Sequence, residues 1–105
     1  MSNVLMKIKE LVSFYVRINY EEYLKENGID KIEEEKIKGI IEGMFDERKE
    51  HLKQFVKNAL QELLEETNEY PGDDKVNLIF DEILEDREFC ITKLTTEIQL
   101  YQKNK

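Results

Sequence analysis

Apolar residues recur at steps of three and four along most of this chain. The first segment carries this spacing at Val4, Ile8, Leu11, Tyr15 and Ile18. Such spacing places side chains on one face of an α-helix, and no segment shows the apolar–polar alternation of a half-buried strand. Only four glycines and one proline interrupt the 105 residues, so few positions force a helix to stop. The sequence therefore predicts an all-α fold.

A capping signal at Asn19 predicts a break inside the N-terminal helical region. Asn19 and Glu22 have the spacing of a capping box, in which each of the two side chains accepts from a backbone N–H near the helix start. We therefore expect one helix before Asn19 and a short second helix over residues 20–27. Gly28 would end this second helix, because glycine adopts the left-handed conformation of a helix stop at little steric cost.

A second capping box, Asp30 with Glu33, predicts a helix that runs from Asp30 toward Thr67. A polar run over residues 46–51 divides the apolar positions of this helix into two clusters. The run is either an exposed part of one continuous helix or a joint at which Asp46 caps a new helix. We favour the continuous helix, and the joint stays open as the alternative.

The dipeptide Pro71-Gly72 marks a loop, after which an aspartate supplies the N-cap of the last helix. This helix extends to Tyr101 and has a polar middle over residues 85–88. We expect it to fold back on the preceding helix as a long C-terminal antiparallel hairpin, with the first segment packed against both. The expected hairpin contacts join Leu63, Leu60 and Phe55 to Ile79, Phe80 and Ile83. The predicted fold is a small antiparallel bundle of four to five helices.

Chain length and cysteine content indicate one domain in a reducing compartment. A chain of 105 residues supplies one modest core but not two, so we expect residues 1–105 to form a single domain. Cys90 is the only cysteine, which excludes an intramolecular disulfide and a cysteine-rich zinc site. Lys7, Lys9 and Glu10 interrupt the apolar positions near the N-terminus, so we expect neither a signal peptide nor a membrane span. The expected location is cytoplasmic.

Residue patterns that carry enzyme chemistry are absent from the sequence. His51 is the only histidine, and nothing in the sequence identifies a catalytic partner for it. A Glu-x-x-His metal motif would need glutamate at the position of Arg48. The scattered glycines form neither a P-loop nor a dinucleotide fingerprint. We therefore interpret the protein as a non-enzyme, with no catalytic residues, no metal and no cofactor.

Acidic residues are concentrated between positions 61 and 88. This segment has 11 acidic and two basic residues, a net charge of −9, whereas the remaining 77 residues sum to +1. The net charge of −8 for the whole chain argues against direct binding to nucleic acid or to an anionic membrane. The segment is either a surface that attracts a cationic partner or a solvated face that keeps the protein in solution. The candidate partner-binding residues are Glu62, Glu65, Glu66, Glu69, Tyr70, Asp73, Asp74, Asp81, Glu82 and Glu85.

Tyr70 is included because tyrosine beside charged residues is common at binding hot spots. No motif identifies a family, although size and charge are similar to those of small acidic helical proteins that neutralise secreted nucleases. The leading hypothesis is a small acidic protein–protein interaction module, an immunity- or antitoxin-type inhibitor that neutralises a basic nuclease or another nucleic-acid-binding protein. The alternative is a structural or chaperone-like helical subunit that self-associates, for example as a homodimer, or assembles with a companion protein. A carboxylate-rich metal protein is the third hypothesis.

Overall fold

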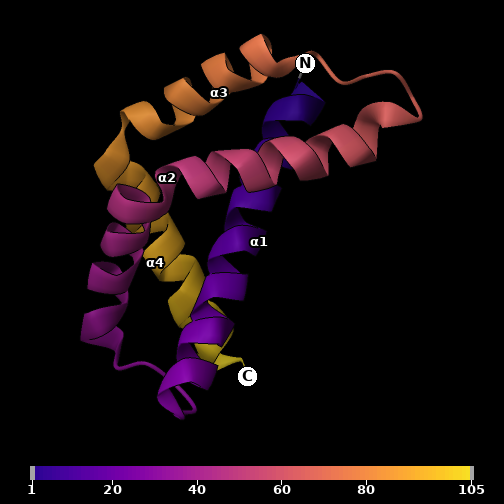
Figure 1. Cartoon of the computed structure of the whole chain (residues 1–105). Helices are drawn as coiled ribbons and strands as arrows, with labels where there is room; N and C mark the ends of the chain where they lie inside the picture. The colour runs from indigo at the N-terminus through magenta and orange to yellow at the C-terminus, as the bar shows by residue number, and fades with distance from the viewer. Residues whose placement is uncertain (1, 105) are drawn as a thin grey trace.

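The computed structural model describes residues 2–104, which form four α-helices and no strand (Figure 1). The helices are α1 (Ser2–Asn27), α2 (Glu34–Glu65), α3 (Asp73–Glu85) and α4 (Arg87–Lys103). α1 and α4 run side by side in the same direction, because Ser13 pairs with Glu97 and, further along both helices, Tyr20 pairs with Gln102. The first half of α2 packs beside them, and its second half forms a hairpin with α3 at one end of the molecule (Figure 1). The predicted all-α bundle is confirmed.

α1 continues through Asn19, so the predicted break at this residue is wrong. Val16, Tyr20 and Leu24 lie four residues apart and are all buried, so one apolar stripe crosses the expected break. The Asn19 side-chain amide donates to the backbone carbonyl of Tyr15 at 2.8 Å, one turn earlier in the same helix. A capping box stabilises a helix start, but it does not interrupt a helix whose buried stripe continues on both sides.

Gly28 ends α1 as predicted, with a φ of +60°. The N–H groups of Gly28 and Ile29 donate to the carbonyls of Lys25 and Leu24 at 3.3 and 3.1 Å. These two bonds and the left-handed residue form a Schellman stop. The chain repeats this arrangement after α2 at Asn68, whose φ is +61°.

α2 begins at Glu34, four residues later than the capping box at Asp30 predicts. Glu33 occupies the N-cap position without a side-chain hydrogen bond. Ile32 stays outside the helix because its N–H donates to the side-chain oxygen of Gln102 at 2.7 Å, and its carbonyl accepts from the Gln102 amide nitrogen at 2.8 Å. A residue 70 positions away therefore helps to decide where α2 starts.

α2 bends at Arg48, where φ of −118° and ψ of 20° depart from helical values. Figure 1 shows the two halves of α2 leaving this bend in different directions. The polar run over residues 46–51 is therefore a joint, and the continuous helix that we favoured is wrong. The Asp46 carboxylate binds Arg87 of α4 at 3.0 and 3.2 Å rather than capping a new helix. The bend directs the second half of α2 toward α3.

The single last helix that the sequence predicts after the loop is two helices. Asp86, with φ of −94° and ψ of 77°, separates α3 from α4, and its side chain accepts from the N–H of Phe89 at 3.1 Å. The hairpin therefore comprises only α3 and the second half of α2. Gly72, with a φ of +102°, holds the N-cap position of α3, so the predicted aspartate N-cap is wrong, and Asp73 and Asp74 lie in the first turn instead.

The core contains buried side chains from all four helices, among them Ile8, Val16, Leu52, Leu60, Phe80 and Ile91. Leu60 and Phe80 are buried, as the expected hairpin contacts require. Leu63 is not, because 55% of its surface is exposed. Phe55 packs on α1 as well, where its ring centre lies 5.2 Å from that of Tyr15.

Candidate functional site

The predicted partner-binding residues lie on the hairpin of α2 and α3. All nine acidic residues among them are exposed, and Tyr70 is half-buried in the loop between the two helices. Glu62 and Glu65 end α2, Glu66 and Glu69 lie in the loop, and the remaining acidic residues are in α3. We call the solvent-exposed part of residues 61–85 the hairpin surface.

Most carboxylates of the hairpin surface have no opposite charge beside them. Asp81 lies 3.5 Å from the ammonium group of Lys53, and Asp73 accepts a hydrogen bond from the Tyr70 hydroxyl. The other seven of the nine form no ion pair within residues 2–104. Their mutual repulsion is not relieved inside the chain, so the hairpin surface carries a negative potential that attracts cationic groups.

Tyr70 is held by the protein rather than fully presented to solvent. Its ring packs against the hydrophobic core, and its hydroxyl donates to the Asp73 carboxylate at 2.5 Å. Burial, then this hydrogen bond and the charge of Asp73, raise the pKa of Tyr70 to about 12. Tyr70 therefore forms a fixed part of the hairpin loop, with its hydroxyl already engaged.

Two exposed leucines belong to the hairpin surface and are missing from the sequence-based set. Leu63 of α2 is 55% exposed and Leu78 of α3 is 64% exposed. Leu78 precedes Asp81 and Glu82 by three and four residues, so all three share one side of α3. Leu63 and Leu78 therefore add exposed apolar area to a surface that is otherwise acidic, and a partner that covers this surface would bury that area. The sequence signal was weak for Leu63, which fits the helical core pattern, whereas Leu78 lies off the apolar stripe of Val76, Ile79 and Phe80.

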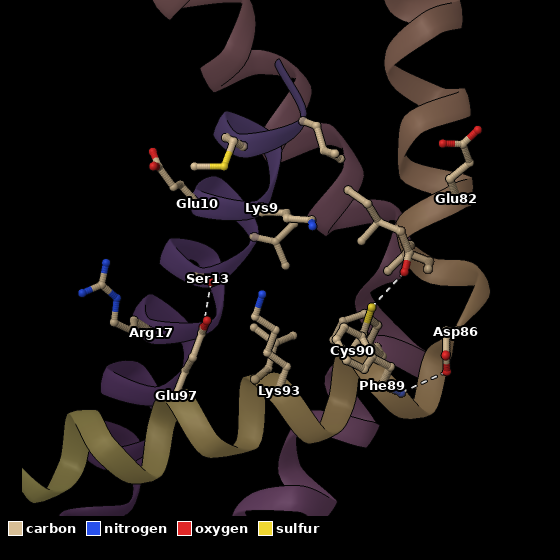
Figure 2. Close-up of a pocket in the computed structure, with 17 residues that line it drawn as sticks. Lys9, Glu10, Ser13, Arg17, Glu82, Asp86, Phe89, Cys90, Lys93 and Glu97 are labelled. Carbon is tan, nitrogen blue, oxygen red and sulfur yellow. Dashed lines mark hydrogen bonds between the residues drawn. The ribbon is translucent and has the colours of Figure 1, made fainter. Parts of the chain in front are cut away.

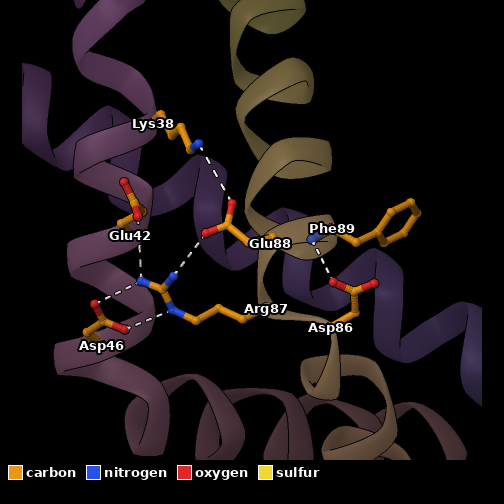
Figure 3. A network of polar contacts seen from close by, with 7 residues as sticks. All are labelled: Lys38, Glu42, Asp46, Asp86, Arg87, Glu88 and Phe89. Carbon is orange, nitrogen blue, oxygen red and sulfur yellow. Dashed lines mark hydrogen bonds and ion pairs between the residues drawn. The ribbon is translucent and has the colours of Figure 1, made fainter.

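At the end of the acidic segment, residues 86–88 form polar contacts within the fold, as Figure 3 shows. The Arg87 guanidinium binds both carboxylate oxygens of Asp46 and lies 3.6 Å from Glu42 and 3.4 Å from Glu88. Lys38 lies 3.8 Å from Glu88 on its other side. Hydrogen bonding to Asp46 is the main cause of a raised pKa for Arg87. This network joins the start of α4 to the first half of α2, so it does not belong to the hairpin surface.

The single histidine and the single cysteine do not form a reactive pair. His51 is exposed on α2. The Cys90 thiol donates to the Ile83 carbonyl at 2.9 Å, and burial followed by the charge of Asp86 raises its pKa. A raised pKa disfavours the reactive thiolate.

Three further findings concern the chain as a whole. Residues 2–104 contain no group of three or more histidine, cysteine, aspartate or glutamate side chains that could hold a metal ion. None of the helices within this range has the length and apolar character needed to cross a membrane. Comparisons with protein-family models, curated proteins and solved structures give no match.

Proposed function

We propose that this protein is a protein–protein interaction module that binds a basic partner through the hairpin surface. The observation that carries the proposal is the presence of two exposed leucines, Leu63 and Leu78, on a surface where seven carboxylates have no ion pair. The carboxylates attract a cationic partner and speed its association. The leucines supply apolar area whose burial slows dissociation.

In its specific form, the proposal is an immunity- or antitoxin-type inhibitor of a nuclease or another nucleic-acid-binding protein. Such a partner exposes lysine and arginine side chains that bind phosphate groups. Carboxylates have the same sign of charge as phosphates, so the hairpin surface competes for the same side chains. Inhibition then results from covering the nucleic-acid site, and it needs no catalytic residue on this chain.

The first experiment captures the partner at low salt from cells that make the protein and measures association and dissociation rates with the purified pair. We expect a basic partner whose association slows steeply as salt increases, because screening weakens attraction between exposed charges. If the partner is a nuclease, a stoichiometric amount of this protein should abolish its activity on nucleic acid.

A charge-reversal variant tests the surface itself. Glu66→Lys, Glu69→Lys and Asp74→Lys together change three exposed residues that have no ion pair. We expect this triple variant to slow association by about tenfold or more at low salt and to flatten the salt dependence. Asp73 is left unchanged, because it binds Tyr70 and its loss would also disturb the loop.

A matched control variant separates the effect of charge on the hairpin surface from the effect of the net charge of the protein. Glu26→Lys, Asp30→Lys and Glu35→Lys make the same change in net charge at exposed positions outside the hairpin. This control should retain most of the association rate. Leu78→Ser, in contrast, should speed dissociation by about tenfold with little change in association.

Three results would contradict the proposal. The first is an acidic captured partner. The second is equal association rates for the hairpin and control triple variants. The third is a complex of this chain with itself or a companion whose affinity does not fall with salt, which would support the assembly of apolar helix faces instead.

A further inference from the structure

A cavity of about 780 Å³ lies between the first half of α1, the end of α3 and the first half of α4. Its volume is within the range of about 300–1,000 Å³ that is typical of small-molecule sites. The apolar side chains along it include Leu5 and Met6 of α1, Ile83 and Leu84 of α3, and Phe89 of α4. Met6 is 58% exposed and Phe89 is 63% exposed, so the cavity opens to solvent beside large apolar groups that residues 2–104 leave partly uncovered.

Two lysines reach into this apolar cavity from different helices. Figure 2 shows Lys9 of α1 and Lys93 of α4 with their ammonium groups directed into the space between the helices. Neither ammonium forms an ion pair with a carboxylate of residues 2–104. The charge of Asp86 and, after it, those of Lys93 and Lys9 act on the thiol of Cys90 on the cavity wall, so both lysines lie close to this residue. The two positive charges therefore share one apolar space.

The acidic side chains around the cavity are engaged elsewhere or directed away from the lysines. Glu97 accepts a hydrogen bond from Ser13 at 2.7 Å, and Asp86 caps the start of α4. Glu10 and Glu82 point away from the centre of the cavity (Figure 2). The remaining charged group, Arg17, also points outward (Figure 2). The cavity therefore combines apolar walls with two ammonium groups that have no ion-pair partner within residues 2–104, and two of the four carboxylates along it, Glu97 and Asp86, already accept hydrogen bonds.

We infer that this cavity binds an amphiphilic carboxylate, with a medium-chain fatty acid as the matching chemical class. The carboxylate lies between the Lys9 and Lys93 ammonium groups, and the hydrocarbon chain lies along Leu5, Ile83 and Phe89. An apolar ligand without charge would cover the ammonium groups and remove their hydration without replacing it, which is unfavourable. A carboxylate compensates for this loss with charge-assisted hydrogen bonds. The inference does not depend on the binding of a basic partner to the hairpin surface.

The direct test compares decanoate, decanol and decylamine, which have the same chain and differ in the head group. Binding of each to the full chain is measured by calorimetry below the concentration at which the ligand forms micelles. We expect decanoate to bind at least about tenfold more tightly than decanol, and decylamine to bind most weakly, because only decanoate carries a charge opposite to that of the lysines. Octanoate should bind more weakly than decanoate, by about threefold or more per methylene lost.

Lysine variants locate the head group. Lys9→Gln and Lys93→Gln should each weaken decanoate binding by about fivefold to tenfold and leave decanol binding unchanged. Both residues are exposed, so the substitutions should not disturb folding. Lys25→Gln and Lys103→Gln remove the same charge from exposed positions of α1 and α4 outside the cavity, and these controls should bind decanoate like the wild type.

The single cysteine independently reports the position of the ligand's hydrocarbon chain. Cys90 lines the cavity, so bound decanoate should slow its modification by a small thiol reagent, and decylamine at the same concentration should not. Equal binding of the three head groups, or decanoate affinity unchanged in both lysine variants, would overturn the inference. Absence of Cys90 protection, much tighter binding of decyl phosphate, or self-association that covers the cavity and excludes decanoate would also overturn it.

Discussion

The side chain of Gln102 should contribute more to stability than its place near the end of the last helix suggests. Its amide nitrogen donates to the Ile32 carbonyl at 2.8 Å, and its oxygen accepts from the Ile32 N–H and the Tyr20 hydroxyl, each at 2.7 Å. Ile32 and Tyr20 are 4% and 3% exposed. One amide thus connects α4 to α1 and to the segment between α1 and α2.

The expected effect of Gln102→Ala follows from these three hydrogen bonds. A hydrogen bond in a protein contributes about 1 kcal/mol net, and a buried backbone group left without its partner costs about 1–3 kcal/mol. Gln102 is only half-buried, so water can replace part of what the amide supplies. We therefore expect the free energy of unfolding to fall by about 3 kcal/mol. For a domain of this size, that corresponds to a decrease of about 15 °C in Tm.

The assay is urea denaturation followed by circular dichroism for the wild type, Gln102→Ala, Tyr20→Phe and the double variant. The double-mutant cycle should give a coupling energy of about 1 kcal/mol between Gln102 and Tyr20. Gln99→Ala is the matched control on the same helix, and it should change stability by less than about 0.5 kcal/mol. A Gln102→Ala variant as stable as this control, or a coupling energy near zero, would refute the reasoning.

Two further predictions concern the glycines of α2 and the tyrosine of the hairpin loop. Gly39 and Gly43 are helical, and a methyl group at either position meets no atom within 4 Å apart from its chain neighbours and the backbone of its own helix. Gly39→Ala and Gly43→Ala should therefore each stabilise the protein by about 1 kcal/mol in urea denaturation. A loss of stability would show that the two glycines are needed for packing. Because folding raises the pKa of Tyr70 to about 12, its contribution to stability is complete below about pH 10 and is lost as the pH rises through about 12. The ultraviolet titration of the wild type minus that of Tyr70→Phe should therefore place the ionisation of Tyr70 near pH 12, and Asp73→Asn should lower that value. An unchanged titration curve in Asp73→Asn would contradict the assigned hydrogen bond.

The sequence by itself determined the helical content and two helix boundaries. Apolar residues spaced by three and four positions lie on one face in a helix, which can then bury that face. All four helices have this spacing. Gly28 and the Pro71-Gly72 loop were predicted correctly, because positive φ and the absence of a proline N–H act through the local backbone alone. The exposure of the acidic residues was also determined locally, because unpaired charges are unfavourable in a protein interior.

Tertiary structure decided the features that depend on residues far apart in the sequence. The capping boxes at Asn19 and Asp30 were not used as predicted, because a buried stripe continues across the first and Gln102 holds the chain outside a helix after the second. Asp46, two residues before the bend at Arg48, lies beside Arg87, 41 residues away.

For the hairpin surface and the cavity, too, some features follow from the sequence and others only from the fold. The sequence located the carboxylates of the hairpin surface, but only the packed helices showed that Leu63 remains exposed. Likewise, only the fold brings Lys9 and Lys93 to one apolar cavity. Local propensity makes the segments helical, whereas several helix ends, the pairing of charges and the covering of apolar side chains are fixed by the neighbours that packing supplies.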